Sequence, residues 1–120
     1  MEKILIVDDS PTETYVIKKM LENNGYTSLE ATNGFDGIEM AKKEKPDLIL
    51  MDVVMPGING FQTTRRLNRD PETTDIPVII VTIRNQNVDK VWGLRQGAQD
   101  YLTKPLEENV LIPRIKKLLN

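Results

Sequence analysis

The chain has 120 residues, of which 39% are hydrophobic and 28% are charged, and 16 basic against 18 acidic side chains give a formal net charge of −2. This length fits one domain with a hydrophobic core, and the charge balance disfavours nucleic acid binding through a basic surface. Cysteine and histidine are absent, which excludes disulfides, thiol and imidazole chemistry, and metal sites built from those residues.

Short apolar runs alternate with longer segments of helical periodicity along the chain. The runs predict five strands, at residues 4–7, 28–31, 48–51, 78–81 and 101–102. The first, third and fourth runs are continuously apolar, which is typical of parallel strands covered by helices on both faces. The alternation predicts an α/β fold with a doubly wound, five-stranded parallel sheet and right-handed crossovers.

Five helices are predicted between and after these strands. The first has the clearest start, with Ser10 as N-cap, Pro11 as first helical residue and Glu13 completing a capping box. Apolar residues at helical spacing mark the others, around residues 38–41, 61–67, 88–92 and 111–119. We expect Trp92 to pack in the core, with contact to a partner as the alternative, and we expect Pro113 to kink or delay the last helix.

No apolar run approaches the roughly 20 residues that span a bilayer, and no basic-then-apolar leader precedes Ile4. We therefore expect a cytoplasmic protein without membrane insertion.

Polar residues follow the predicted strands at their carboxyl ends, where open parallel α/β sheets bind ligands. They are Asp8 and Asp9 after the first strand, Asp52 after the third, Thr82 after the fourth and Lys104 after the fifth. Each alone has a plain structural explanation, as a helix cap, a turn residue, a strand residue or a surface lysine. Their convergence on one edge of the sheet favours a functional site.

The residue types indicate the chemistry of this site. Clustered carboxylates repel one another, and oxygen ligands without histidine or cysteine favour Mg²⁺. A carboxylate beside such a metal can attack phosphorus and hold an acyl phosphate. The Lys104 ammonium and the Thr82 hydroxyl are suitable partners for the phosphoryl oxygens.

Four groups of residues form a recognisable pattern: Ile4-Leu5-Ile6-Val7-Asp8-Asp9-Ser10, residues 47–52 with Met55-Pro56-Gly57 and Gly60, Val81-Thr82, and Gly97-Ala98 leading to Tyr101-Leu102-Thr103-Lys104-Pro105. Through these motifs the sequence, from Lys3 to Leu119, resembles the CheY-like receiver domains of two-component response regulators. The resemblance implies a flavodoxin-like (βα)5 sheet with strand order 2-1-3-4-5. It also implies that residues 1–120 form a single receiver domain without an effector domain.

The resemblance implies a role for the residues around Asp52. Asp52 would accept phosphate from the phosphohistidine of a histidine kinase. Asp8, Asp9 and Asp52, with the backbone carbonyl of Val54, would bind Mg²⁺.

The resemblance further implies a switch. The Thr82 hydroxyl would move toward the phosphate and the Tyr101 ring would rotate inward behind it. Lys104 would contact the phosphate, and Lys104–Pro105 would be a cis peptide. The fourth helix, fifth strand and fifth helix would then respond to a downstream protein, and the chain would be a monomer or a weak phosphorylation-dependent dimer.

Ile83 departs from the pattern of the family, in which a small residue usually follows the switch threonine. Our hypothesis is that Ile83 restricts access to the phosphorylation site; the alternative is that it points along the loop. Residues 9–13, 53–62 and 89–105 are similar to stand-alone regulators of type IV pilus (twitching motility) systems.

Four alternatives remain at this stage. A phosphatase of the haloacid dehalogenase type uses similar residues but needs an acid two residues after its nucleophile, where this chain has Val54. A receiver fold that is not phosphorylated is disfavoured by the complete set of polar residues. A transcription factor is disfavoured because the sequence ends where a DNA-binding domain would begin. A phosphate sink without an output partner stays open.

Overall fold

Strands and helices alternate strictly along residues 2–120, the part of the chain that the computed structural model describes. The strands are β1 (Lys3–Val7), β2 (Thr27–Ala31), β3 (Leu48–Met51), β4 (Val78–Thr82) and β5 (Asp100–Thr103). The helices are α1 (Pro11–Asn23), α2 (Gly34–Glu44), α3 (Gly60–Arg69), α4 (Asn87–Arg95) and α5 (Glu108–Leu119). Among these helices, none combines the length and the apolar character needed to cross a membrane.

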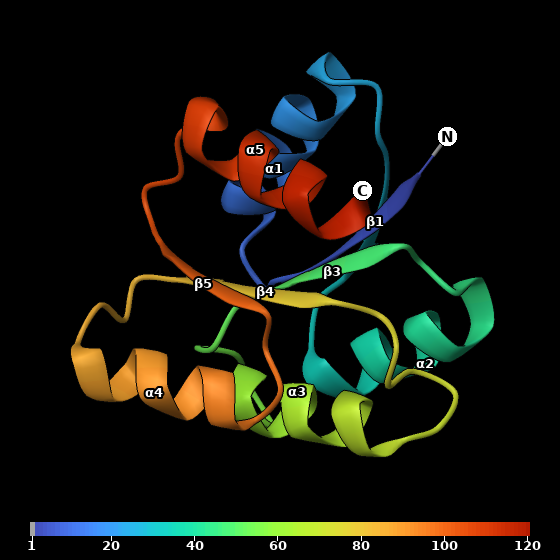
Figure 1. Cartoon of the computed structure of the whole chain (residues 1–120), viewed down its shortest axis with the longest axis vertical. Helices are drawn as coiled ribbons and strands as arrows, with labels where there is room; N and C mark the ends of the chain where they lie inside the picture. The colour runs from blue at the N-terminus through green and yellow to red at the C-terminus, as the bar shows by residue number, and fades with distance from the viewer. Residues whose placement is uncertain (1) are drawn as a thin grey trace.

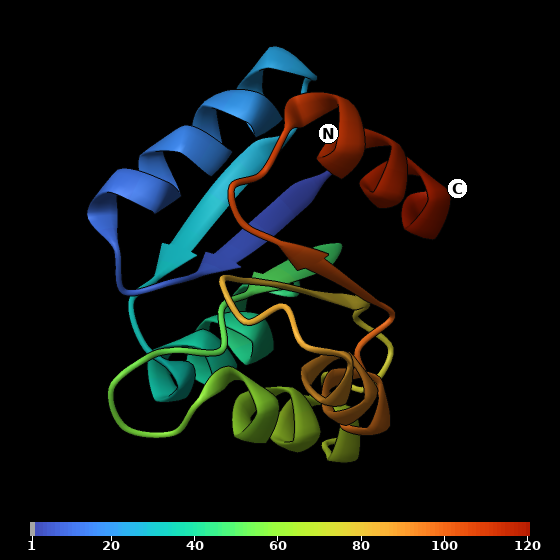
Figure 2. The same cartoon turned by 90° about the vertical axis from the view of Figure 1, so that its left-hand side faces the viewer.

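The strands form one parallel sheet in the order β2-β1-β3-β4-β5, which confirms the predicted fold and strand order. Helices α1 and α5 cover one face of the sheet, and α2, α3 and α4 cover the other (Figure 1). In Figure 2 the arrows of β1 and β2 point the same way, and the chain enters α1 from that edge. The carboxyl ends of all five strands therefore share one edge, as the sequence predicted.

Each central strand contributes to two hydrophobic clusters, one on each face of the sheet. In β1, Ile4 and Ile6 belong to the cluster beneath α1 and α5, whereas Leu5 and Val7 belong to the cluster beneath α2 and α3. All four side chains are at most 1% exposed. Because successive side chains of a strand point to opposite faces, burial on both faces requires an unbroken apolar run.

The predicted capping box of α1 forms only in part. Ser10 is the N-cap, and its hydroxyl accepts a hydrogen bond from the Glu13 backbone N–H at 3.3 Å. The Glu13 carboxylate does not accept the second hydrogen bond of the box, because the Ser10 N–H donates to Asp8 Oδ1 at 2.9 Å instead. The Glu13 carboxylate instead accepts a hydrogen bond from Lys104.

The expectation that Trp92 packs in the core is wrong, since this side chain is 52% exposed. Helix α4 buries Asp89 and Gly93 instead, one position away from the apolar side chains Val88 and Trp92. A Cβ on Gly93 would lie 2.8 Å from Ile80 and 2.9 Å from the ring of Tyr101. Helix α4 therefore faces the sheet with its smallest residue, and its large apolar residues face outward.

Helix α5 is not delayed by Pro113, as it begins at Glu108 and continues past the proline to Leu119. Pro113 is exposed, whereas its neighbours Leu111, Ile112 and Ile115 are buried. These side chains pack against the sheet on the same face as α1. Burial of this apolar face stabilises the helix despite the missing backbone donor.

Gly60, at the start of α3, allows this helix to approach the backbone that follows β3 closely. A Cβ at this position would lie 2.0 Å from the backbone oxygen of Asp52. We expect Gly60→Ala to lower the free energy of unfolding by about 3 kcal/mol, because the backbone after β3 must shift. Denaturant titration measures this loss.

Gly25→Ala is the matched control. Gly25 has a φ of +83° and no atom near the position of an added Cβ, so only the left-handed backbone is strained, at about 1 kcal/mol. Equal losses for both variants would contradict close contact between Gly60 and Asp52.

Candidate functional site

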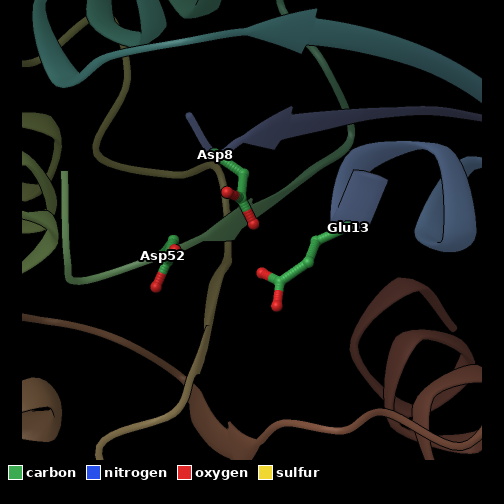
Figure 3. Close-up of side chains that lie close together, drawn as sticks. All are labelled: Asp8, Glu13 and Asp52. Carbon is green, nitrogen blue, oxygen red and sulfur yellow. The ribbon is translucent and has the colours of Figure 1, made fainter. Parts of the chain in front are cut away.

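Three carboxylates meet at the carboxyl edge of the sheet. Asp8 follows β1, Asp52 follows β3, and Glu13 lies in the first turn of α1. One oxygen from each lies within 4.8 Å of the others, and Figure 3 shows the three side chains close together at the ends of their elements. Asp8 and Asp52 are buried. Negative charges this close need a cation to offset their repulsion.

Lys104, in the segment after β5, supplies a cation. Its Nζ lies 2.8 Å from Asp8 Oδ2 and 3.3 Å from Asp52 Oδ2, and it also donates a hydrogen bond to Glu13 Oε2. The lysine side chain is only 7% exposed. Burial alone would lower the pKa of Lys104, but hydrogen bonds to Asp8 and Glu13 and the charge of Asp52 outweigh it and raise the pKa. The ammonium therefore stays charged at neutral pH.

The two oxygens of Asp52 have different surroundings. Oδ1 accepts a hydrogen bond from the Val53 N–H at 2.7 Å, with the Val54 N–H further away at 3.4 Å. Oδ2 faces Lys104. Burial raises the pKa of Asp52, Lys104 opposes this, and the charge of Asp8 adds to it. The backbone thus fixes the orientation of the carboxylate while one oxygen stays directed at the cationic centre.

Thr82, at the end of β4, is fully buried, and its hydroxyl has no hydrogen bond partner among the described residues. The hydroxyl acts to lower the pKa of Asp52, although it does not meet the geometry of a hydrogen bond. A buried hydroxyl without a partner costs about 1–3 kcal/mol. Thr82 is therefore a donor available to a group bound at Asp52.

Tyr101 is buried beside α4. Its hydroxyl donates a 2.7 Å hydrogen bond to the carbonyl of Arg84, and its ring lies against Gly93. Burial, with the nearby charge of Asp89, raises the pKa of Tyr101 to about 12. The ring already lies on the inside in this structure, where the family resemblance implied an inward rotation.

The remaining predicted residues lie around this centre. Asp9 is exposed and outside the group formed by Asp8, Glu13 and Asp52, and Val54 is exposed as well. Their roles as metal ligands stay predictions. Ile83, next to the buried Thr82, is 65% exposed. The Lys104–Pro105 peptide bond is cis.

Sequence reasoning missed two contributors to the site. Glu13 was interpreted only as part of a helix cap, and the Arg84 carbonyl was not considered. One signal for Glu13 was available: the first turn of a helix that follows β1 lies at the same edge of the sheet as Asp8. No pattern in the sequence marks Arg84, because its contribution comes from the backbone.

Comparison with known proteins is consistent with this geometry. The family model described as the response regulator receiver domain matches residues 4–116. The chain is 60% identical to Protein PilH of Pseudomonas aeruginosa over 99% of its own length and 98% of that protein. It is 40% identical to the DNA-binding dual master transcriptional regulator RpaA of Synechocystis, over 99% of this chain but only 49% of that protein.

Solved structures agree as well. The chemotaxis protein CheY4 of Vibrio cholerae superposes with a TM-score of 0.92 at 28% identity, covering 99% of both chains. The receiver domain of the sensor histidine kinase PA1611 of P. aeruginosa superposes with a TM-score of 0.91 at 29% identity, covering 98% of this chain and 97% of that one. The latter is described with a magnesium ion coordinated in its active-site cleft. The chain belongs to the response regulator receiver domain family.

Proposed function

We propose that this chain is a stand-alone response regulator of a two-component phosphorelay, in which Asp52 accepts a phosphoryl group from the phosphohistidine of a histidine kinase. The observation that carries the proposal is the Asp52 carboxylate, which is buried at the end of β3, is oriented by the Val53 N–H and faces the Lys104 ammonium. The chain aligns with 98% of the length of PilH, which supports a single receiver domain over residues 1–120.

The groups that meet at this edge suit the transfer. A carboxylate oxygen of Asp52 bonds to phosphorus while the bond from phosphorus to one imidazole nitrogen of the kinase breaks. The other imidazole nitrogen carries a proton, so the products are an acyl phosphate and a neutral histidine. Lys104 and the unpartnered hydroxyl of Thr82 then donate hydrogen bonds to the phosphoryl oxygens. Hydrogen bonds to charged groups contribute about 1.5–3 kcal/mol each.

Mg²⁺ fits the residues of this site. The cluster of Asp8, Glu13 and Asp52 contains only oxygen ligands and already surrounds one cationic group, so a further cation is favoured. We assign its binding to Asp8, Asp9 and Asp52 with the backbone carbonyl of Val54. When bound, the metal supplies positive charge that offsets the charge of the phosphoryl group.

The output is proposed to be a change on the surface of α4, β5 and α5, which a downstream protein recognises. Thr82 and Tyr101 lie on neighbouring strands, and the Tyr101 ring contacts Gly93 of α4. Movement of the Thr82 hydroxyl toward phosphate would therefore alter the support of α4. The chain is expected to be a monomer or a weak phosphorylation-dependent dimer in the cytoplasm.

The resemblance to stand-alone pilus regulators and the identity with PilH support a role in twitching motility or in signalling of the chemotaxis kind. A phosphate sink without an output partner is the alternative within the same family. The protein is not proposed to be a turnover enzyme. A phosphatase of the haloacid dehalogenase type needs a general acid two residues after its nucleophile, and this chain has Val54 there. Release of phosphate from small phosphomonoesters in catalytic amounts would overturn this assignment.

The first prediction concerns the acceptor. Incubation with Mg²⁺ and a phosphorylated histidine kinase should add one phosphoryl group to the wild type and none to Asp52→Asn, as measured by intact mass. Asp75→Asn, which changes an exposed aspartate, is the matched control and should be phosphorylated like the wild type. If the wild type takes up no phosphate, the proposal that Asp52 is a phosphate acceptor is wrong.

The second prediction concerns Ile83, which we propose restricts access of water to the acyl phosphate. Ile83→Ala should speed the decay of phosphorylated protein by about threefold, a loss of about 0.7 kcal/mol from the barrier. Loss of label over time measures the rate. Val88→Ala is the control: it shortens an exposed apolar side chain of α4, a helix that begins after Ile83, and should leave the rate unchanged. An unchanged rate in Ile83→Ala would support the alternative in which this side chain points along the loop.

The third prediction uses Trp92, the single tryptophan of the chain, which is exposed on α4 beside Gly93. Adding Mg²⁺ with beryllium fluoride, a phosphoryl analogue, should change its fluorescence in the wild type and leave Asp52→Asn unchanged. Thr82→Ala should reduce the change because the hydroxyl that couples Asp52 to α4 is gone. A change of equal size in Thr82→Ala would contradict this route.

A further inference from the structure

Lys104 has three carboxylate partners, and they are not equivalent. Its Nζ lies 2.8 Å from Asp8 but 3.3 Å from Asp52, and it donates a further hydrogen bond to Glu13. Of these partners, Glu13 is the most exposed, with a side chain that is 41% accessible, against 2% for Asp8 and 9% for Asp52. The ammonium is therefore held on the α1 side of the cluster, and its contact with Asp52 is longer than its contact with Asp8.

Glu13 gives up a local interaction to make this contact. At its position in α1 a glutamate can accept a hydrogen bond from the N-cap N–H, as Gln62 Oε1 does from the Asn59 N–H in α3 at 2.9 Å. In α1 the Ser10 N–H is bonded by Asp8, and the Glu13 carboxylate turns to Lys104. The Glu13 carboxylate is thus directed at Lys104 rather than at the cap of its own helix.

Lys104 and a metal ion compete for the same oxygens. Both are cations, and both require Asp8 and Asp52. When a metal binds these carboxylates, repulsion displaces the ammonium, which must keep a partner because an unpaired buried charge costs several kcal/mol. Glu13 is such a partner, and it lines a groove of about 180 Å³ between α1 and the segment after β5, with Val16 and Leu106 among its other residues.

We propose that Glu13 is a positioning residue that holds Lys104 away from Asp52, so that the divalent cation of the proposed phosphotransfer site can bind between Asp8 and Asp52. The inference rests on the proposed function. Without Glu13, the ammonium has only the carboxylates that the metal needs, and it pairs with them more closely. The metal then binds more weakly, although no atom of Glu13 has to touch it.

The test is a double-mutant cycle on Mg²⁺ affinity, measured by calorimetric titration of the unphosphorylated protein with MgCl₂. The four proteins are the wild type, Glu13→Gln, Lys104→Met and the double variant. A charge that acts only through space changes the affinity by the same factor in both backgrounds, whereas coupled residues deviate from additivity. We expect Glu13→Gln to weaken Mg²⁺ binding about fivefold more when Lys104 is present than in Lys104→Met.

Two further variants distinguish the Glu13–Lys104 contact from the effect of the Glu13 charge alone and from damage to α1. Glu13→Asp keeps the charge but shortens the reach, and it should lose the part of the effect that depends on Lys104. Glu22→Gln makes the same chemical change on α1 at a surface pair with Lys19, 3.9 Å apart, and it should bind Mg²⁺ like the wild type. Circular dichroism checks that each variant is folded.

The outcomes distinguish this inference from the proposed function. If the wild type binds no Mg²⁺, the proposed metal site itself fails. If the wild type binds Mg²⁺ and the Glu13→Gln factor is the same in both backgrounds, Glu13 acts directly on the ion and the positioning role is wrong. Affinity of Glu13→Asp equal to that of the wild type would also overturn the role, because charge alone would then suffice.

Discussion

The site depends on one buried ammonium among three carboxylates that come from separate elements. Lys104 bonds to Asp8 after β1, Glu13 in α1 and Asp52 after β3. Breaking such a group by removing one partner typically costs 3–5 kcal/mol, since the remaining charges stay buried. The same ammonium therefore fixes the geometry of the edge and sets the charge that a ligand meets there.

The ammonium does not balance all of the acidic groups around it. The cluster places three carboxylates around one ammonium, an excess of acidic groups that a divalent cation would offset. Burial raises the pKa of Asp52, so the charged form of this carboxylate is disfavoured unless a cation lies beside it. The oxygen ligands of the cluster fit the proposed metal, and in the proposed function a phosphoryl group would bring negative charge that pairs with Lys104.

Much of this architecture follows from patterns that act over short distances. Continuous apolar runs identified β1, β3 and β4, because strands buried on both faces need apolar side chains at every position. Once the sheet was predicted to be parallel, the residue after each strand had to lie at one edge. Asp8, Asp52 and Lys104 are brought together there by topology alone.

The errors came from contacts between distant parts of the chain. Glu13 and Lys104 are 91 residues apart, so a capping rule that considers only neighbours could not include their bond. The buried face of α4 depends on the close approach of Gly93 to the Tyr101 ring, which no spacing of apolar residues in α4 reveals. The periodicity of Val88 and Trp92 correctly predicted a helix but identified the wrong face as buried.

These distant contacts also connect the site to the surface. The Thr82 hydroxyl is buried without a hydrogen bond partner among residues 2–120, and a hydrogen bond to it would recover about 1–3 kcal/mol. Tyr101 lies on the next strand, bonded to the Arg84 carbonyl at the entry to α4 and packed against Gly93.

A shift from 1:99 to 99:1 between two states requires about 5.5 kcal/mol. In the proposed function, bonds from Thr82 and Lys104 to a phosphoryl group, at about 1.5–3 kcal/mol each, would supply most of that difference. Because the Tyr101 ring is already inside, the surface expected to respond in that proposal is α4, whose large apolar side chains are exposed.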